Sequence, residues 1–475
     1  MSIEYLGLSS INGPLVVLEG VKGAAYDEIV EMTVDGKEKR LGRIIEINDD
    51  KAVIQVFEGT DRMALRNTHT KLTGKPMEIG VSESMFGRTF NGIGEPIDGL
   101  GHVEAEKTLD VNGKPLNPVT REYPRNYIRT GISAIDGLMT LIRGQKLPIF
   151  SGNGLPHDEL AAQLVRQSSL GDSDNDDEKF AVVFAAMGVK HDVADFFQRT
   201  FAESGVSDHV ITFINLANDP VVERLITPKV ALTVAEYLAF EKGMHILVIL
   251  TDMTSFAEAM REVSSSKGEI PSRKGFPGYL YSELATIYER AGIVSGVNGS
   301  VTQIPILTMP NDDITHPIPD LTGYITEGQI VLDRDLNGQS IYPPISVLPS
   351  LSRLMKDGIG EGFTRADHQD VANQLFSSYS KVGDARALAS VIGEDELSDT
   401  DKKYLVFGRA FEQMFIGQSV NDNRTIFETL DIGWNLLGLM PKGELDRIDT
   451  KILDKYYKPT MLDANGDIVP ATVED

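Results

Sequence analysis

A glycine-containing loop, Ser151 to Asp158, carries the sequence features that come closest to a known chemistry. It follows a short apolar run, Leu147 to Phe150, and precedes a segment whose apolar residues recur at helical spacing. The order of strand, glycine-containing loop and helix is typical of phosphate-binding loops, in which backbone N–H groups surround a polyphosphate. We therefore expect a buried strand, a tight loop and a helix at this place.

Four residues of this loop depart from the pattern that phosphate chemistry needs. A working loop reads G-x-x-x-x-G-K-[ST], with the Lys on phosphate oxygens and the hydroxyl on magnesium. In that register Ser151 and Pro156 replace the two glycines, and His157 and Asp158 replace the Lys and the hydroxyl residue. Pro156 has no N–H to donate, and a carboxylate about 4 Å from a phosphate charge costs roughly 4 kcal/mol at an effective dielectric of 20. We expect a degenerate loop whose fold is kept and whose catalysis is lost; the alternative is that its glycines merely end a strand.

A second nucleotide-site signal lies in the run from His245 to Asp252, an apolar strand that ends in an acid able to orient magnesium. Many strands end in an acid, so this signal gains weight only beside the loop. A hydrolytic site would also need a carboxylate near Val189 to position water, and the sequence has none there. We therefore predict no complete active site in this chain, with no catalytic residue and no metal ligand of its own.

Other polar residues favour structural roles. His157 has no nucleophile at a suitable spacing, which favours a structural loop residue over a catalytic one. Asp312, Asp313 and His316 could suggest a metal cluster, but three prolines surround them. A rigid turn near an interface is the better interpretation.

Charge and composition limit the classes of partner. The 475 residues include 70 Asp and Glu against 45 Lys and Arg, a formal net charge of −25, which opposes non-specific binding to nucleic acid or to an anionic membrane. The absence of cysteine excludes disulfides and Cys nucleophiles. Met1 to Ser10 lacks the features of a signal peptide, and the strongest apolar run, Ile246 to Leu250, is far too short to span a bilayer. Any membrane role is therefore expected to come through partners.

Residues 1–75 predict a small β-barrel, because short strand-like runs alternate with turns and no useful helical period interrupts them. The strand-like runs are Pro14 to Leu18, Ile29 to Val34, Arg43 to Ile47 and Ala52 to Phe57. Val34-Asp35-Gly36-Lys37 is a hairpin signal, and residues 48–50 form another turn. A glycine-rich bridge, Phe86 to Gly99, marks a domain boundary.

Residues 76–350 predict a doubly wound α/β domain. Beyond the strand at Leu147, the expected strands are Phe180 to Ala186, Val210 to Asn215, His245 to Leu250 and Val301 to Leu307. The expected helices are Asp192 to Glu203, Pro220 to Lys242, Ser255 to Val263 and Gly278 to Ala291. The strand runs lack period-two alternation, as a parallel sheet covered on both faces requires. Asp219 before Pro220 reads as a helix N-cap.

Residues 351–460 predict a helical domain, and residues 461–475 a flexible tail. The expected helices are Arg365 to Ser380, Ala385 to Ile392, Asp399 to Phe415 and Thr425 to Leu439. Trp434, the only tryptophan, stands among leucines and is expected in the core.

Together these stretches resemble the non-catalytic B subunit of V/A-type rotary ATPases and ATP synthases over nearly the whole chain. The most specific matching segments are Gly131 to Asp136, Ser151 to His157, Pro277 to Tyr281, Gln303 to Pro310 and Pro349 to Arg353. The resemblance implies an α/β core with a RecA-like parallel sheet and a degenerate P-loop, an N-terminal β-barrel and a C-terminal α-helical domain.

The resemblance also implies a function and a set of partners. Three B subunits alternate with three catalytic A subunits in a hexameric head, around central rotor stalk subunits and beside peripheral stalk subunits. ATP or ADP with magnesium lies at the A/B interface, held mainly by the A subunit. The complex sits on the cytoplasmic face of a membrane and couples ATP hydrolysis or synthesis to proton or sodium transport. A small basic loop with Lys267, Arg273 and Lys274 then suggests a contact with an acidic partner such as the rotor.

Arg353 is the residue that the resemblance assigns to the neighbour's ATP, as an arginine finger reaching the γ-phosphate bound on A. It follows a proline-rich segment, which could hold it at a domain edge, and a guanidinium presents donors suited to phosphate oxygens. Such an arginine supplied in trans is worth about 10³ to 10⁵ in rate, or roughly 4 to 7 kcal/mol. The alternative is a surface arginine paired to Asp357 or Glu361.

Two other functions fit the same fold class. An autonomous ATPase with an unusual loop would hydrolyse ATP as the isolated chain. A ring-shaped nucleic-acid translocase would need an intact phosphate loop and a basic, aromatic-bearing groove. The net charge and the residues at His157 and Asp158 oppose the translocase.

Overall fold

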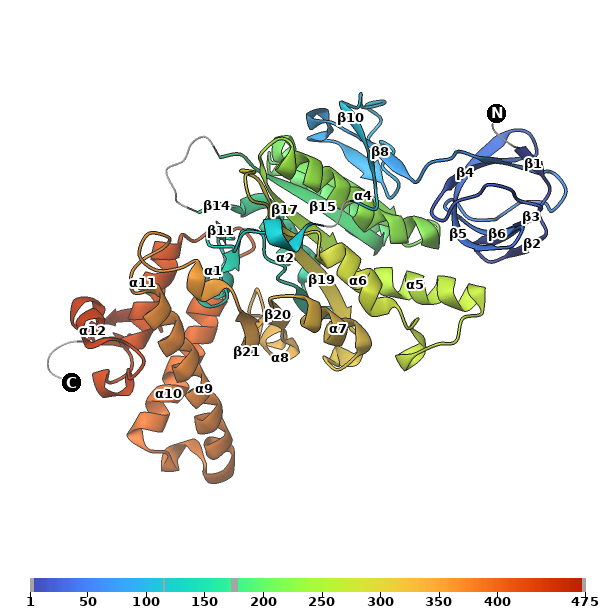
Figure 1. Ribbon diagram of the computed structural model, residues 1–475. Helices are drawn as coiled ribbons and strands as arrows, with labels where there is room; N and C mark the ends of the chain where they lie inside the picture. The colour runs from blue at the N-terminus through green and yellow to red at the C-terminus, as the bar shows by residue number, and fades with distance from the viewer. Residues whose placement is uncertain (1–3, 114–115, 172–177, 472–475) are drawn as a thin grey trace. The chain divides into compact units, whose positions relative to one another are not determined.

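The computed structural model describes residues 4–113, 116–171 and 178–471 (Figure 1). The chain divides into two compact units. Unit 1 comprises residues 1–122, 178–309 and 313–325, and unit 2 comprises residues 123–177, 310–312 and 326–475. Within the described ranges, no helix has both the length and the apolar character needed to cross a bilayer.

Unit 1 begins with a seven-stranded antiparallel sheet in the order β1-β7-β4-β5-β6-β3-β2. Its strands are β1 (Glu4–Leu6), β2 (Ser10–Asn12), β3 (Leu15–Glu19), β4 (Ile29–Val34), β5 (Glu38–Asn48), β6 (Lys51–Val56) and β7 (Thr68–Leu72). Val16, Val30, Ile44 and Ile54 meet in one core inside the sheet, as the alternation of side chains along strands requires. The four predicted strands are confirmed; β1, β2 and β7 were missed because they are short or polar.

The predicted hairpin between β4 and β5 is also confirmed. Val34 pairs with Glu38 across the turn, and the two central residues, Asp35 and Gly36, have φ values of 50° and 69°. Three residues thus connect the two strands, and the first two have positive φ, which Asp tolerates and Gly adopts freely. The local sequence therefore sets the register of this pair.

The α/β part of unit 1 contains five parallel strands in the order β9-β16-β15-β17-β19. They are β9 (Thr89–Asn91), β15 (Phe180–Val189), β16 (Val210–Leu216), β17 (His245–Thr251) and β19 (Ser300–Met309). Side chains on both faces of β15, β16, β17 and β19 are buried, which explains their continuous apolar runs. The sequence missed β9, which comes from the glycine-rich bridge and whose Phe90 stacks on Phe213 at 5.3 Å.

Helices and short strands complete unit 1. They are α3 (His191–Glu203), α4 (Val221–Phe240), α5 (Met253–Lys267), α6 (Leu280–Tyr288), α7 (Pro317–Ile325), β8 (Glu78–Val81), β10 (Lys107–Asp110) and β18 (Gly292–Ile293). The predicted N-cap at Asp219 is wrong. Pro220 occupies the cap position with an extended backbone, while the Asp219 carboxylate accepts the N–H of Leu216 at 2.6 Å and closes the turn before the helix.

Unit 2 carries two sets of strands around the loop at Ser151. In the first, β11 (Tyr127–Arg129) pairs antiparallel with β12 (Leu141–Ile142) and β14 (Ser169–Leu170). In the second, β13 (Ile149–Gly152) pairs parallel with β20 (Gly328–Leu332), which pairs antiparallel with β21 (Ile345–Ser352). The helices among them are α1 (Ser133–Leu138), α2 (His157–Gln167) and α8 (Arg334–Gly338).

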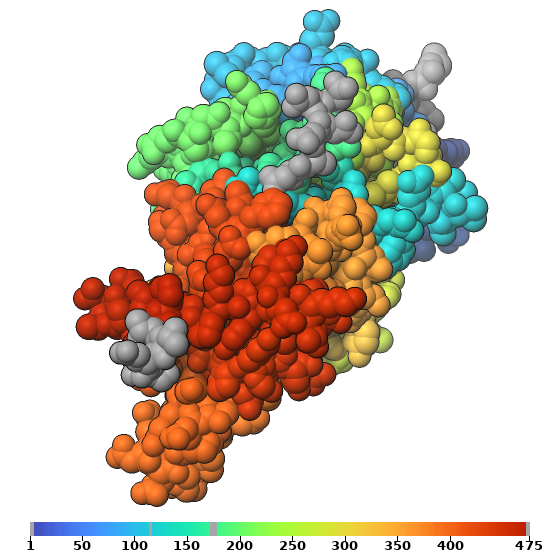
Figure 2. Space-filling view, turned by 90° about the vertical axis from the view of Figure 1, so that its left-hand side faces the viewer, coloured from blue at the N-terminus to red at the C-terminus, as the bar shows by residue number. Residues whose placement is uncertain are grey.

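The C-terminal part of unit 2 is helical, as predicted. It contains α9 (His368–Ile392), α10 (Asp399–Ala410), a π-helical turn at Phe411–Ile416, α11 (Ile426–Leu437) and α12 (Thr450–Tyr456). Phe407, Phe411, Leu437 and Trp434 share one core, which confirms the burial of the tryptophan. The expected break near residue 381 is wrong, because α9 continues through it. The tip of the α9–α10 hairpin protrudes from the rest of unit 2 (Figure 2).

The segment expected to be a flexible tail from residue 461 contains regular structure. Strands β22 (Thr460–Leu462) and β23 (Ile468–Pro470) pair antiparallel. Thr460 attaches this hairpin to α11, since its N–H donates to Gly438 O at 3.0 Å and its hydroxyl donates to Asn435 O at 2.7 Å. A polar hairpin held by backbone contacts gives no apolar pattern in the sequence, which is why it was not predicted.

Candidate functional site

The loop between β13 and α2 has the strand–loop–helix layout that the sequence predicts, but its backbone donors are used internally. The N–H of Leu155 donates to Gly152 O at 3.1 Å, and the N–H of His157 donates to Leu155 O at 2.8 Å. Pro156 takes the cap position of α2 and has no N–H, and no side chain caps this helix end. Three consecutive backbone positions therefore offer a phosphate no hydrogen bond.

The side chains of the loop are equally unsuited to a polyphosphate. Ser151 is buried, and its hydroxyl lies 3.0 Å from Nδ1 of His157. The other ring nitrogen of His157 lies 3.8 Å from a carboxylate oxygen of Asp158. The residue at the Lys position is thus tied to Ser151 and faces an acid, in agreement with its prediction as a structural loop residue.

An ion pair that sequence reasoning missed lies against the same loop. Arg334 donates to Asp312 from Nε at 2.7 Å and from Nη2 at 2.9 Å, and Nη2 also donates to Asn153 O at 3.0 Å. A Cβ on Gly152 would come within 2.1 Å of Asp312 Oδ1, so the pair packs directly on the loop backbone. The hydrogen bond from Arg334 lowers the pKa of Asp312, which keeps this carboxylate ionised and paired beside the loop.

The sequence contains one signal that could have found this pair. Asp312 and Arg334 each follow shortly after a strand, β19 and β20, and the carboxyl ends of parallel strands are where an α/β fold places ligand-binding side chains. Asp313, which was grouped with Asp312 as a cluster, instead accepts from Thr315 and Lys274. His316 packs edge-on against Phe276 at 5.6 Å. Among the described residues, no group of three His, Asp or Glu side chains is placed to hold a metal ion.

Arg353 stands directly after β21 with an exposed side chain. The one hydrogen bond found for its guanidinium in the described parts of the chain is a long one, from Nη1 to Thr326 O at 3.5 Å. Asp357, a partner considered from the sequence, instead accepts the hydroxyl of Tyr123 at 2.9 Å. No ion pair joins Arg353 to Asp357 or Glu361 within the described ranges, and the guanidinium retains donors for a ligand.

The backbone that carries Arg353 is held firmly. Its N–H donates to Glu327 O at 2.9 Å. The hydroxyl of the preceding Ser352 donates to Thr140 O at 3.0 Å and accepts from the buried side chain of Gln145 at 2.8 Å. A fixed backbone with an exposed guanidinium is the arrangement needed to present an arginine to another molecule.

Glycine is required where β20 passes the end of β21. Gly328 has a φ of 142°, and a Cβ there would come within 2.2 Å of Leu351 O. Farther along, the pairing is irregular, and the Ser350 hydroxyl fills the gap by accepting the N–H of Val331 at 2.9 Å and donating to Ser346 O. These contacts fix the direction in which the chain leaves the strand toward Arg353.

Comparison with known proteins identifies the family. Residues 131–352 match the nucleotide-binding domain of the ATP synthase alpha/beta family, residues 357–457 match the C-terminal domain of V and A type ATP synthase, and residues 8–68 match the beta-barrel domain of the alpha/beta family. The V-type ATP synthase beta chain 2 of Clostridium tetani is 63% identical over 458 residues, which are 96% of this chain and 99% of that protein. The chain belongs to the B-subunit family of V/A-type ATP synthases.

Further relatives agree with this assignment. The V-type ATP synthase beta chain of Halothermothrix orenii is 61% identical over 463 residues, 98% of this chain and 99% of that protein. A solved structure of the ATP synthase subunit NeqB from Nanoarcheaum equitans is 40% identical with a TM-score of 0.71, covering 89% of this chain and 98% of that one. The three matched domains confirm the predicted fold class, and none of these relatives supports an autonomous ATPase or a nucleic-acid translocase.

The second nucleotide-site motif of this family member is occupied by internal contacts in unit 1. The Asp252 carboxylate caps α5 by accepting the N–H of Thr254 at 2.8 Å, and it accepts the N–H and the hydroxyl of Thr308 at 3.2 and 2.6 Å. Near Val189, the amide oxygen of Asn215 accepts from Gly188 at 3.1 Å and from Arg224 at 2.9 Å. The groups in contact at this strand end are therefore an amide and a guanidinium.

The basic loop near residue 270 is neutralised within unit 1. Its three cations pair with carboxylates: Lys267 with Glu269 at 3.3 Å, Arg273 with Asp320 at 3.2 Å and Lys274 with Asp313 at 3.1 Å. Each of these charges has an internal counter-ion, and the contact with an acidic partner stays a prediction.

Proposed function

We propose that this chain is the non-catalytic, regulatory B subunit of a rotary ATP synthase or ATPase, and that Arg353 acts as an arginine finger on ATP held by a neighbouring A subunit. The family membership supplies the kind of complex. Two features of the chain support the roles proposed for it. One loop lacks the residues that bind phosphate, and one arginine has an exposed side chain.

The degenerate loop supports the non-catalytic role. The N–H groups of Leu155 and His157 bond within the loop, and Pro156 has none. The Asp312–Arg334 pair packs on Gly152. A polyphosphate entering here would meet negative charge and would lose the backbone donors on which such loops depend.

The arginine-finger role is supported mainly by the backbone contacts and the side-chain exposure of Arg353. Its backbone is fixed through Glu327 and Ser352, while its guanidinium is exposed and has no ion-pair partner within the described ranges. Some other exposed arginines of this acidic chain pair with carboxylates, as Arg273 and Arg334 do. An arginine left without a counter-ion on a rigid strand end is suited to an anion supplied by another molecule.

The proposal extends to the assembly. Three B subunits alternate with three A subunits, ATP or ADP with magnesium lies at the A/B interface, and central and peripheral stalk subunits connect the head to a membrane sector that moves protons or sodium ions. The chain then works peripherally at the cytoplasmic face of a membrane. We assign residues 1–75 to the barrel, 76–350 to the α/β domain, 351–460 to the helical domain and 461–475 to a C-terminal tail.

The test is ATP hydrolysis by reassembled A/B particles that carry Arg353→Ala. Loss of an arginine finger should lower kcat by about 10³-fold or more, and Arg353→Lys should recover only part of it, because an ammonium cannot reproduce the fork of donors. Assembly, measured by gel filtration, should be unchanged.

Arg447→Ala is the matched control. Arg447 is also an exposed arginine of unit 2, and its one carboxylate contact, to Asp446, is 3.8 Å long. Its loss should leave kcat within about twofold of the wild type, because such a long surface pair contributes little. Near-normal turnover in intact Arg353→Ala particles would refute the proposed role.

A further inference from the structure

A cavity of about 210 Å³ lies within unit 1, where the barrel meets the helices of the α/β part. Its walls come mainly from four elements: Arg43 and Ile45 from β5, Leu225 and Lys229 from α4, Phe256, Met260, Val263 and Lys267 from α5, and Tyr279 and Glu283 at the start of α6. Gln55 from β6 and Tyr26, which precedes β4, complete the lining. Spacings of two on the strand and of three or four on the helices place each set on one face. One face of each of these elements therefore lines the cavity.

Cations outnumber carboxylates among the side chains that line this cavity, although the whole chain carries a net charge of −25. Arg43, Lys229 and Lys267 line it against one carboxylate, Glu283. Lys267 has a close partner outside the lining, Glu269 at 3.3 Å. The other two cations also have carboxylate partners, which are Asp27 at 3.4 Å from Arg43 and Glu283 at 3.8 Å from Lys229.

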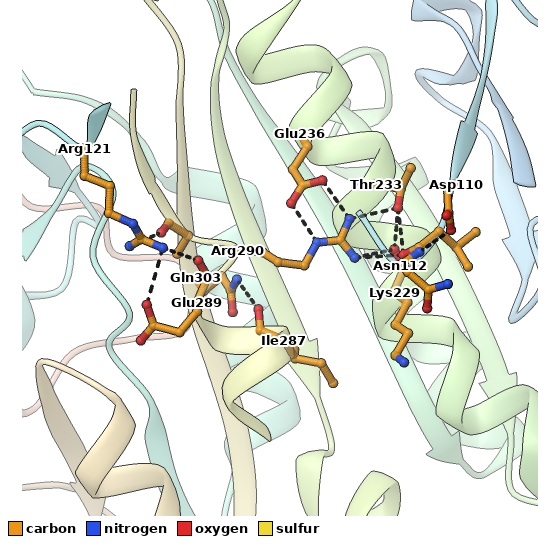
Figure 3. Close-up of polar contacts among 12 residues, drawn as sticks. Asp110, Asn112, Arg121, Lys229, Thr233, Glu236, Ile287, Glu289, Arg290 and Gln303 are labelled. Carbon is orange, nitrogen blue, oxygen red and sulfur yellow. Dashed lines mark hydrogen bonds and ion pairs between the residues drawn. The ribbon is translucent and has the colours of Figure 1, made fainter. Parts of the chain in front are cut away.

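The backbone carbonyl and the side-chain ammonium of Lys229 lie in different environments. Its backbone carbonyl accepts from the buried Arg290, whose guanidinium also holds Glu236 at 2.7 Å, Thr233 at 2.9 Å and Val111 O at 2.9 Å (Figure 3). Its side chain points away from that network (Figure 3) and its ammonium reaches the cavity wall. Burial lowers the pKa of Lys229, and the nearby Arg43 adds to this effect while Glu283 and Asp27 oppose it.

Arg43 contributes a donor without an acceptor. Its Nη2 donates to Gln55 on the neighbouring strand at 3.1 Å, but its buried Nε has no hydrogen-bond partner within the described ranges. A buried guanidinium N–H left unpaired costs free energy, which an anion in the cavity would remove.

We propose that this cavity binds a small phosphomonoester, with the phosphate between Arg43 and Lys229 and an apolar body against α5. The excess of cations over carboxylates suits a dianion better than a carboxylate. The wall formed by Phe256, Met260 and Val263 is buried and apolar, which suits a ring or short chain. A volume of about 210 Å³ suits a body of about the size of one aromatic ring.

The site would join the barrel to the α/β part, because its phosphate contacts come from β5 and from α4. Binding there should stabilise the junction by mass action. It goes beyond the proposed function, since neither Arg353 nor the degenerate loop takes part.

The test is isothermal titration of the full chain with inorganic phosphate and with phenyl phosphate. We expect saturable binding of both, with phenyl phosphate at least fivefold tighter. Lys229→Met, which keeps the apolar stem and removes a buried charge, should weaken both at least tenfold, as should Arg43→Gln. Lys242→Met is the control, since Lys242 lies just beyond the end of α4 and pairs with Glu83 and Glu106 outside the cavity, and it should bind as the wild type does.

Two results would overturn the proposal: unchanged affinity in Lys229→Met, or phenyl phosphate binding no tighter than inorganic phosphate. A measurement on the wild-type chain tests the site even if a variant fails to fold. Acetylation of Lys229, followed by mass spectrometry, should slow several-fold with phenyl phosphate present while acetylation of Lys242 does not change. Equal rates at Lys229 with and without the ligand would contradict the site.

Discussion

Single residues decide the chemistry in unit 2. His157 stands where a phosphate loop carries its Lys, and it bonds to Ser151 instead of presenting a cation. Arg353 shows the opposite condition, with a charge that is exposed and has no ion-pair partner within the described ranges. The departure of the loop from the phosphate-binding pattern could be inferred from residue types alone. The Asp312–Arg334 pair that packs on Gly152 could not be predicted from residue types, because the two residues are 22 positions apart and come together only in the folded chain.

Gly328→Ala should disturb the support of Arg353. The new Cβ would collide with Leu351 O at a φ that L-residues avoid, so we expect the free energy of unfolding to fall by about 1–3 kcal/mol and ATP hydrolysis by A/B particles to fall with it. Urea unfolding and turnover measure the two effects. Gly338→Ala, where nothing lies within 4 Å of the new Cβ, is the control; equal behaviour of the two variants would contradict the role of Gly328.

At the scale of elements, long apolar runs in the sequence predicted strands correctly, whereas short or polar segments did not reveal theirs. The apolar runs of β15, β16, β17 and β19 appear where expected because burial on both faces demands them. The strand β9 and the hairpin β22–β23 were missed, since neighbours in the fold, not local residues, make them strands. The cap at Asp219 failed for the same reason: its carboxylate closes a turn on Leu216 before the helix begins.

The junction of α9 and α11 depends on a buried carboxylate. Asp367 is fully buried, which raises its pKa, but hydrogen bonds from Arg365 and from Trp434 Nε1, at 2.6 Å, outweigh burial and leave the pKa lowered. Trp434→Phe removes one donor and should cost about 1–3 kcal/mol of unfolding free energy. Tyr456→Phe keeps the ring that stacks on Trp434 at 5.6 Å and should be nearly neutral. Denaturant titration compares them, and a neutral Trp434→Phe would show that the hydrogen bond contributes nothing.

Helix α4 carries a pH-dependent element at Glu223. Burial, with the nearby Asp219, Glu58 and Glu95, raises the pKa of Glu223 to about 7 from 4.5. A carboxyl group with a raised folded-state pKa stabilises the fold fully below pH 4.5, and this contribution is lost as the pH rises through 7. Glu223→Gln should therefore exceed the wild type in unfolding free energy by up to about 3 kcal/mol at pH 8 and match it near pH 4.5. A pH-independent difference between the two proteins would contradict this.

At the scale of the whole molecule, composition and the order of patterns were enough to indicate a barrel, an α/β part and a helical part, and the family comparisons confirm these three domains. Net charge was equally informative about partners. With −25 at neutral pH, the chain should bind DNA or RNA more weakly than about 10⁻⁴ M at physiological salt. Fluorescence anisotropy with labelled oligonucleotides tests this, and saturable micromolar binding would revive the translocase.

The central claim is that this chain completes a neighbour's transition state with Arg353 while its own loop does no chemistry. The most direct measurement is the affinity of A/B particles for ADP with aluminium fluoride, which mimics the phosphoryl group in transit, beside their affinity for ATP. Because catalysis requires tighter contact in the transition state than in the ground state, Arg353→Ala should weaken the analogue about 10³-fold and ATP less than tenfold. Equal analogue affinity in wild-type and Arg353→Ala particles would contradict the account.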